Sequence, residues 1–257
     1  MNEIEQAFKK HKAFIGFIVG GDGGVEYSIR CGIELALSGV DILEIGLPFS
    51  DPVADGPVIQ SAAERSLQGG TTASTLLEIA RGIRKTVSTP LLLFSYYNPL
   101  LKRGDEYLLE LKEAGFSGVL VVDLPPPITQ GPHPFFEVLK RVGLTPIFLV
   151  SPSTDDRRLE EIVKMSEGFI YYACQKGTTG VRDKLPEETQ RHIERIKKYT
   201  KLPIAIGFGI AERSSALEAI SYADGFVVGS AFVKLMGERV DPKKLKSLVE
   251  KIDPRQK

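Results

Sequence analysis

The fold is decided by the stretch Asp41-Ile42-Leu43-Glu44-Ile45-Gly46-Leu47-Pro48-Phe49-Ser50-Asp51-Pro52-Val53-Ala54-Asp55-Gly56-Pro57-Val58-Ile59-Gln60. Its first part is apolar and partly β-branched around one acid, which predicts a buried strand over 42–46. The three prolines that follow predict a stiff loop over 47–57, suited to holding side chains over the end of that strand. An apolar run of this kind is typical of parallel strands that are covered on both faces.

Short apolar runs like this one alternate with amphipathic stretches along the whole chain. The runs predict eight strands over 14–19, 42–46, 91–95, 118–122, 145–150, 168–173, 204–207 and 225–228. The amphipathic stretches predict helices over 4–11, 26–38, 73–87, 105–114, 134–142, 155–165, 186–199, 212–220, from 231, and over 241–251. This rhythm predicts an α/β fold, a (β/α)8 TIM barrel with an additional N-terminal helix, as a single domain over 1–257. An open doubly wound sheet is the alternative, but no Gly-x-Gly-x-x-Gly sequence follows the first strand.

Composition excludes several classes of partner. The chain has 33 basic and 33 acidic residues, so its net charge of zero gives no support for nucleic acid or an anionic membrane surface. No apolar run reaches the length of a membrane helix, and the first residues lack the pattern of a signal peptide. The two cysteines are far apart and lack zinc-site spacing. We therefore expect a cytoplasmic protein with no metal site.

Two acids, Glu44 and Asp55, are the candidate catalytic residues. An acid inside a buried strand is costly unless it is paired, hydrogen-bonded or neutral. Catalytic groups of TIM barrels lie at the C-terminal ends of strands and in the loops that follow. We therefore expect both acids to project into the same mouth. The alternative is structural, with Glu44 satisfied by a partner and Asp55 acting as a turn residue or a helix N-cap.

A phosphate site is predicted where the last three strands end. The sequences there are Gly177-Thr178-Thr179-Gly180, Gly207-Phe208-Gly209-Ile210 and Gly229-Ser230-Ala231. Glycines let backbone amides approach an anion, and a helix N-terminus supplies free N–H groups. TIM barrels often bind phosphate with the loops after strands seven and eight. The alternative is that these glycines serve only tight loops.

The segment 44–60, with both acids in place, closely resembles the signature of the tryptophan synthase α subunit, and the resemblance continues along most of the chain. It implies retro-aldol cleavage of indole-3-glycerol phosphate to indole and glyceraldehyde 3-phosphate, in tryptophan biosynthesis. It also implies that no cofactor is needed and that the chain works with a β subunit in an α2β2 complex. By the same resemblance, Glu44 is the catalytic acid and base, and Asp55 contacts the indole nitrogen.

The resemblance also assigns the residues that bind the substrate. Those of the indole pocket are Phe17, Tyr96 and Tyr171, to which we add Leu124 beyond the fourth strand. Those of the phosphate cradle are Gly180, Phe208, Gly209, Gly229 and Ser230, and Thr179 serves loop closure. We expect Tyr171 to donate a hydrogen bond to the Glu44 carboxyl. For Phe17 alone, an ordinary core position is the alternative.

The chain departs from the family in two places. The loop 173–180 lacks the usual arginine before its glycine, and Lys176 and Arg182 are the candidate substitutes. The stretch 125–134 is longer and richer in proline than usual, on the face that meets the β subunit in the family. Two other functions stay open: a non-catalytic activator of a β subunit, and another phosphate-binding barrel enzyme such as an isomerase. The retained acids and glycines argue against the first, and the segment 44–60 against the second.

Overall fold

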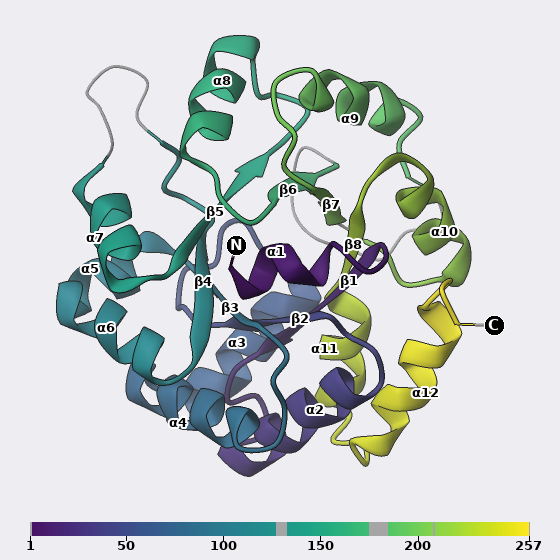
Figure 1. The fold of residues 1–257 in the computed structure, drawn as a ribbon. Helices are drawn as coiled ribbons and strands as arrows, with labels where there is room; N and C mark the ends of the chain where they lie inside the picture. The colour runs from purple at the N-terminus through teal and green to yellow at the C-terminus, as the bar shows by residue number, and fades with distance from the viewer. Residues whose placement is uncertain (1, 127–132, 175–184, 208, 257) are drawn as a thin grey trace.

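The structure is a computed structural model that describes residues 2–126, 133–174, 185–207 and 209–256. Within these residues, eight parallel strands close into a barrel in sequence order (Figure 1). They are β1 (Ala13–Val19), β2 (Ile42–Gly46), β3 (Leu91–Ser95), β4 (Phe116–Val121), β5 (Thr145–Val150), β6 (Ile170–Ala173), β7 (Ile204–Gly207) and β8 (Gly225–Val228). The predicted TIM barrel is therefore confirmed.

Helices surround the barrel on its outer side, except for α1, which lies across one end (Figure 1). They are α1 (Glu3–Ala7), α2 (Val25–Leu37), α3 (Pro57–Gln68), α4 (Ala73–Arg84), α5 (Tyr97–Arg103), α6 (Asp105–Glu113), α7 (Pro134–Val142), α8 (Asp156–Met165), α9 (Thr189–Lys197), α10 (Arg213–Tyr222), α11 (Ser230–Gly237) and α12 (Lys243–Ile252). None of the helices in the described ranges has the length and apolar character needed to cross a lipid bilayer.

Two of these helices, α3 and α5, lie where no helix was predicted from the sequence. Pro57 is the first residue of α3 and Pro99 lies in the first turn of α5. A proline is tolerated there because the N–H groups of the first turn have no partner within the helix. The prediction that the loop over 47–57 includes Pro57 was therefore wrong. The strand β4 also begins two residues earlier than predicted, at Phe116.

The N-terminal helix α1 closes one end of the barrel. It is shorter than the predicted 4–11 and lies across the centre of the barrel in Figure 1. Its fully buried Ile4 packs among the side chains that fill the barrel interior. A Cβ atom on Gly118 would lie 2.7 Å from Ile4, and one on Gly168 would lie 3.1 Å away. The two glycines therefore make room for the helix.

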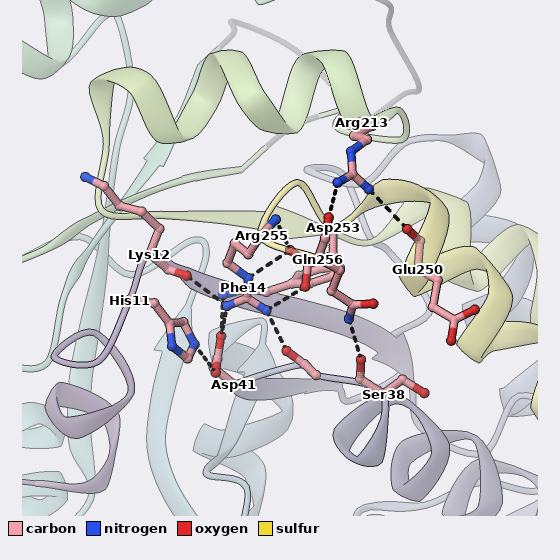
Figure 2. A network of polar contacts seen from close by, with 11 residues as sticks. His11, Lys12, Phe14, Ser38, Asp41, Arg213, Glu250, Asp253, Arg255 and Gln256 are labelled. Atoms are coloured by element: carbon pink, nitrogen blue, oxygen red, sulfur yellow. Dashed lines mark hydrogen bonds and ion pairs between the residues drawn. The ribbon is translucent and has the colours of Figure 1, made fainter.

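The C-terminal residues are fastened near the N-terminal ends of the first strands (Figure 2). The Arg255 guanidinium donates hydrogen bonds to Asp253 and forms an ion pair with Asp41, which directly precedes β2. It also lies over the Phe14 ring of β1, 5.6 Å from the ring centre. Asp253 is 1% exposed, so its hydrogen bonds with Arg255 are shielded from solvent. This network fixes the end of the barrel opposite to the one where the strands terminate.

Candidate active site

A cavity lies at the C-terminal ends of the strands. Its lining comes from β1, β2, β3, β6 and β8, from α3 and α11, and from the loops beside them; the residues are Phe17, Glu44, Asp55, Ile59, Phe94, Tyr171, Gly209, Val227, Gly229 and Ser230. The structure thus brings seven of the residues singled out from the sequence to one place. Three more of them, Thr179, Gly180 and Phe208, lie outside the described residues.

Glu44 enters the cavity from the middle of β2. In the barrel it is level with Phe17 of β1 and Leu92 of β3, both apolar neighbours. The side chain is fully buried, and neither carboxyl oxygen has a hydrogen-bond partner among the described residues. Burial raises the pKa of Glu44 to about 8, because the charged form is poorly solvated there. Near pH 7 the group is therefore mostly protonated and able to give up a proton.

Tyr171 faces Glu44 without bonding to it. The predicted hydrogen bond is wrong, since the Glu44 oxygens have no partner within the described part of the chain. The physical reason is the direction of the Tyr171 ring, whose hydroxyl lies beside β7, the strand next to β6. The Tyr171 hydroxyl packs against the backbone of Gly207, where a Cβ atom would overlap it.

Asp55 reaches the cavity from the residue before the N-cap of α3. The N-cap itself is Gly56, so the reading of Asp55 as a helix N-cap is wrong. Asp55 is 5% exposed, and the Tyr96 hydroxyl donates a hydrogen bond of 2.9 Å to its Oδ2. Burial raises the pKa of Asp55 to about 6, and the hydrogen bond from Tyr96 opposes that rise. Near pH 7 Asp55 is therefore mostly ionised while Glu44 is mostly neutral.

Tyr96 is held as a hydrogen-bond donor. Its hydroxyl accepts a hydrogen bond of 3.0 Å from the Ala54 amide, so its own proton is directed to Asp55. Burial, and next the charge of Asp55, raise the pKa of Tyr96 far above neutral pH. Tyr96 therefore contributes to the site by holding the Asp55 carboxylate in place. Leu124 does not line the cavity in the structure; it is half-buried and packs against the layer between strands and helices.

The glycine-rich side of the cavity offers backbone amides. Gly229 is the N-cap of α11, and Ser230 is its first residue. The first N–H groups of a helix have no partner within it and favour anions. Gly209 has a φ of 77°, a conformation that side chains other than glycine rarely adopt. This side of the cavity can therefore bind an anion without a lysine or arginine.

Comparison with known proteins identifies the family. The sequence profile described as tryptophan synthase alpha chain matches residues 4–255. The tryptophan synthase alpha chain of Chlamydia felis is 53% identical over the whole of both chains. That of Coxiella burnetii is 47% identical, over 99% of this chain and 98% of the other. The chain belongs to the tryptophan synthase alpha chain family.

Solved structures of the family have the same fold. Mycobacterium tuberculosis tryptophan synthase superposes with a TM-score of 0.88 at 32% identity, over 96% of this chain and 95% of that one. A mutant tryptophan synthase alpha-subunit from Pyrococcus furiosus gives 0.86 at 33% identity, over 95% and 98%. As a member of this family, the chain is a carbon–carbon lyase that cleaves indole-3-glycerol phosphate in tryptophan biosynthesis.

Three cavity residues of this family member were missed in the sequence: Ile59, Phe94 and Val227. Phe94 lies two residues after Leu92 on β3, so strand alternation could have placed its side chain on the inner face. Its ring meets that of Phe17 edge-on, with centres 5.2 Å apart. Gly46 leaves room for the Phe17 ring, since a Cβ atom there would lie 2.8 Å from it. Ile59 belongs to α3, a helix that the sequence did not predict.

Proposed function

We propose that this cavity is the site where indole-3-glycerol phosphate is cleaved, with Glu44 as the acid and base and Asp55 as the anion beside the indole nitrogen. One observation carries the proposal. Two buried carboxyl groups line the same cavity, and their environments separate their pKa values to about 8 for Glu44 and about 6 for Asp55. Such a separation gives one acid and one anion at neutral pH, a recurring arrangement in acid–base sites.

The reaction uses the Glu44 and Asp55 carboxyl groups in successive steps. Glu44 gives its proton to C3 of the indole ring, which turns indole into a leaving group and places positive charge on the ring nitrogen. Asp55 stabilises that charge through a charge-assisted hydrogen bond to the N–H. The Glu44 carboxylate then takes the proton of the side-chain hydroxyl adjacent to the bond that breaks. The hydroxyl carbon becomes the aldehyde, the electrons of the broken bond return to the indole ring, and Glu44 is protonated again.

Binding of the substrate follows the two sides of the cavity. The aromatic side, with Phe17 and Tyr171, suits the flat indole ring, and Tyr96 holds Asp55 beside it. The amides near Gly209, Gly229 and Ser230 would take the phosphate group, together with Gly180 and Phe208. Thr179 is assigned to loop closure over the bound substrate.

The chain is proposed to work as the α subunit of an α2β2 complex with the tryptophan synthase β chain, in the cytoplasm and as a single domain over 1–257. The family supports a β-chain partner. The candidate contact face comprises the loop 51–57, helix α5 and the stretch 125–134. Exposed apolar side chains support the first two, because Val53 is 69% and Leu101 59% exposed.

The test is an assay of purified protein with indole-3-glycerol phosphate, with and without a β chain. We expect release of indole and glyceraldehyde 3-phosphate, faster when the β chain is present, because a partner that binds the closed form better favours closure. Glu44→Gln should abolish release, while Glu113→Gln, at an exposed position on α6, should not. A folded protein that activates the β chain but releases no indole would instead be the non-catalytic partner.

A further inference from the structure

A buried carboxylate outside the proposed mechanism joins two of the helices that reach the cavity. Asp22 lies in the loop after β1 and is 1% exposed. Arg65 of α3 donates two hydrogen bonds to it, from Nε to Oδ1 at 3.0 Å and from Nη2 to Oδ2 at 2.7 Å. Arg239, two residues beyond α11, donates a third from Nη2 to Oδ1 at 2.7 Å. One carboxylate thus holds two guanidinium groups.

The surrounding backbone is shaped for this cluster. A Cβ atom on Gly23 would lie 2.7 Å from Nη1 of Arg239, and one on Gly237 would lie 2.9 Å from Nη2 of Arg65. Arg239 itself has a φ of 54°, the only positive value for a non-glycine residue in the described ranges. Its guanidinium also lies over the Tyr27 ring, 5.8 Å from the centre. An unusual backbone conformation persists only when surrounding contacts determine it.

The two helices joined by Asp22 begin at the cavity. Helix α3 starts two residues after Asp55, and its Ile59 lines the cavity. Helix α11 starts at Ser230, which lines the cavity as well. The helices pack together through Ile59, Ala62 and Val233, in one cluster with residues of β1. Their C-terminal ends carry the arginines, where a cation also interacts favourably with the helix dipole.

We propose that Asp22 is a positioning residue for the lyase. By fastening the far ends of α3 and α11, it sets the spacing between Asp55 at one helix start and the amides of Ser230 at the other. This inference rests on the proposed function, in which Asp55 meets the indole ring and Ser230 the phosphate. A substrate that spans both ends is sensitive to that spacing. A ligand that occupies only one end is not.

The experiment compares Asp22→Asn with Asp253→Asn. Asp253 is a matched control because it is equally buried and bonds to Arg255, but at the opposite end of the barrel. Turnover of indole-3-glycerol phosphate is measured with saturating β chain, and binding of glycerol 3-phosphate by calorimetry. For Asp22→Asn we expect kcat/KM to fall by about 10- to 100-fold, the scale of a misplaced substrate. Glycerol 3-phosphate affinity should change by less than about threefold, and Asp253→Asn should leave both quantities near wild type.

Three results would overturn the proposal: full turnover by folded Asp22→Asn, an equal loss of glycerol 3-phosphate affinity, or the same loss of turnover in Asp253→Asn. If Asp22→Asn does not fold, Arg65→Lys gives the same test, because lysine keeps the charge but loses the two-point contact. It should lower turnover more than glycerol 3-phosphate affinity, and equal changes would reject the proposal. Failure of the proposed function is distinguishable, since Glu44→Gln would then still release indole.

Discussion

Replacing Glu44 by glutamine should change how stability depends on pH. The folded protein raises the pKa of Glu44 from 4.5 to about 8. Between these values the unfolded chain has released the proton that the folded chain still holds, so wild-type stability falls as the pH rises. One pKa unit corresponds to about 1.4 kcal/mol, which makes the full effect roughly 5 kcal/mol above pH 8. Glutamine does not titrate, so Glu44→Gln should be free of this loss.

The assay is urea unfolding of wild type and Glu44→Gln at pH 5, 7 and 9. The difference in unfolding free energy should move in favour of the variant by roughly 4 kcal/mol between pH 5 and pH 9. The raised pKa of Asp55 affects both proteins and drops out of the difference. The matched control is Glu113→Gln, which makes the same chemical change at an exposed position on α6. A difference between wild type and Glu44→Gln that stays flat across this range would refute the argument from burial.

Three further changes test the remaining groups. Asp55→Asn should lower turnover more than it raises the Michaelis constant, because the lost charge interacts most strongly in the transition state; steady-state kinetics would show this, and an effect on KM alone would contradict it. Tyr96→Phe removes the hydrogen bond that lowers the Asp55 pKa. In the pH–activity profile of Tyr96→Phe, the rising limb should therefore lie at higher pH than in wild type. A rising limb at the wild-type pH would count against the hydrogen bond from Tyr96 to Asp55. Gly209→Leu should weaken glycerol 3-phosphate binding in calorimetry but leave indole binding little affected, because a φ of 77° is a backbone conformation that leucine rarely adopts. Equal loss of both ligands would reject a phosphate role.

The sequence predicted the barrel well because its strands are apolar runs with clear limits. The strand β2 was predicted with the observed bounds, since Ile42, Leu43 and Ile45 leave little choice between strand and loop. Helix α3 was missed although its buried residues follow helical spacing, at Ile59, Ala62, Ala63 and Ser66. Three of those four residues are alanine or serine. The apolar periodicity was therefore weak, and the prolines favoured a loop.

Individual site residues could be predicted from the sequence, but the contacts between residues that lie far apart in the chain could not. Glu44 and Asp55 stood out because an acid in an apolar strand and an acid in a stiff loop are unusual. A raised pKa of Glu44 follows from an acid in a buried strand, but the effect of the Tyr96 hydroxyl on the pKa of Asp55 could not be read from the sequence, because only the fold brings these two residues together. The cluster at Asp22 was invisible for a similar reason. Its arginines lie 43 and 217 residues away along the chain, and only the fold brings them together.

The measurement that tests the central claim most directly is the pH dependence of kcat/KM for indole-3-glycerol phosphate, which reports the ionisations of the free enzyme and the free substrate. An ionised Asp55 and a protonated Glu44 predict a bell-shaped profile with limbs near pH 6 and pH 8, from the pKa values of about 6 and about 8. The substrate phosphate also titrates near pH 6, so the same profile is recorded for Asp55→Asn, which should lose the part of the rising limb that belongs to the enzyme. A wild-type profile without a falling limb near pH 8, or an Asp55→Asn profile with the wild-type rising limb, would contradict the assignment of the two acids.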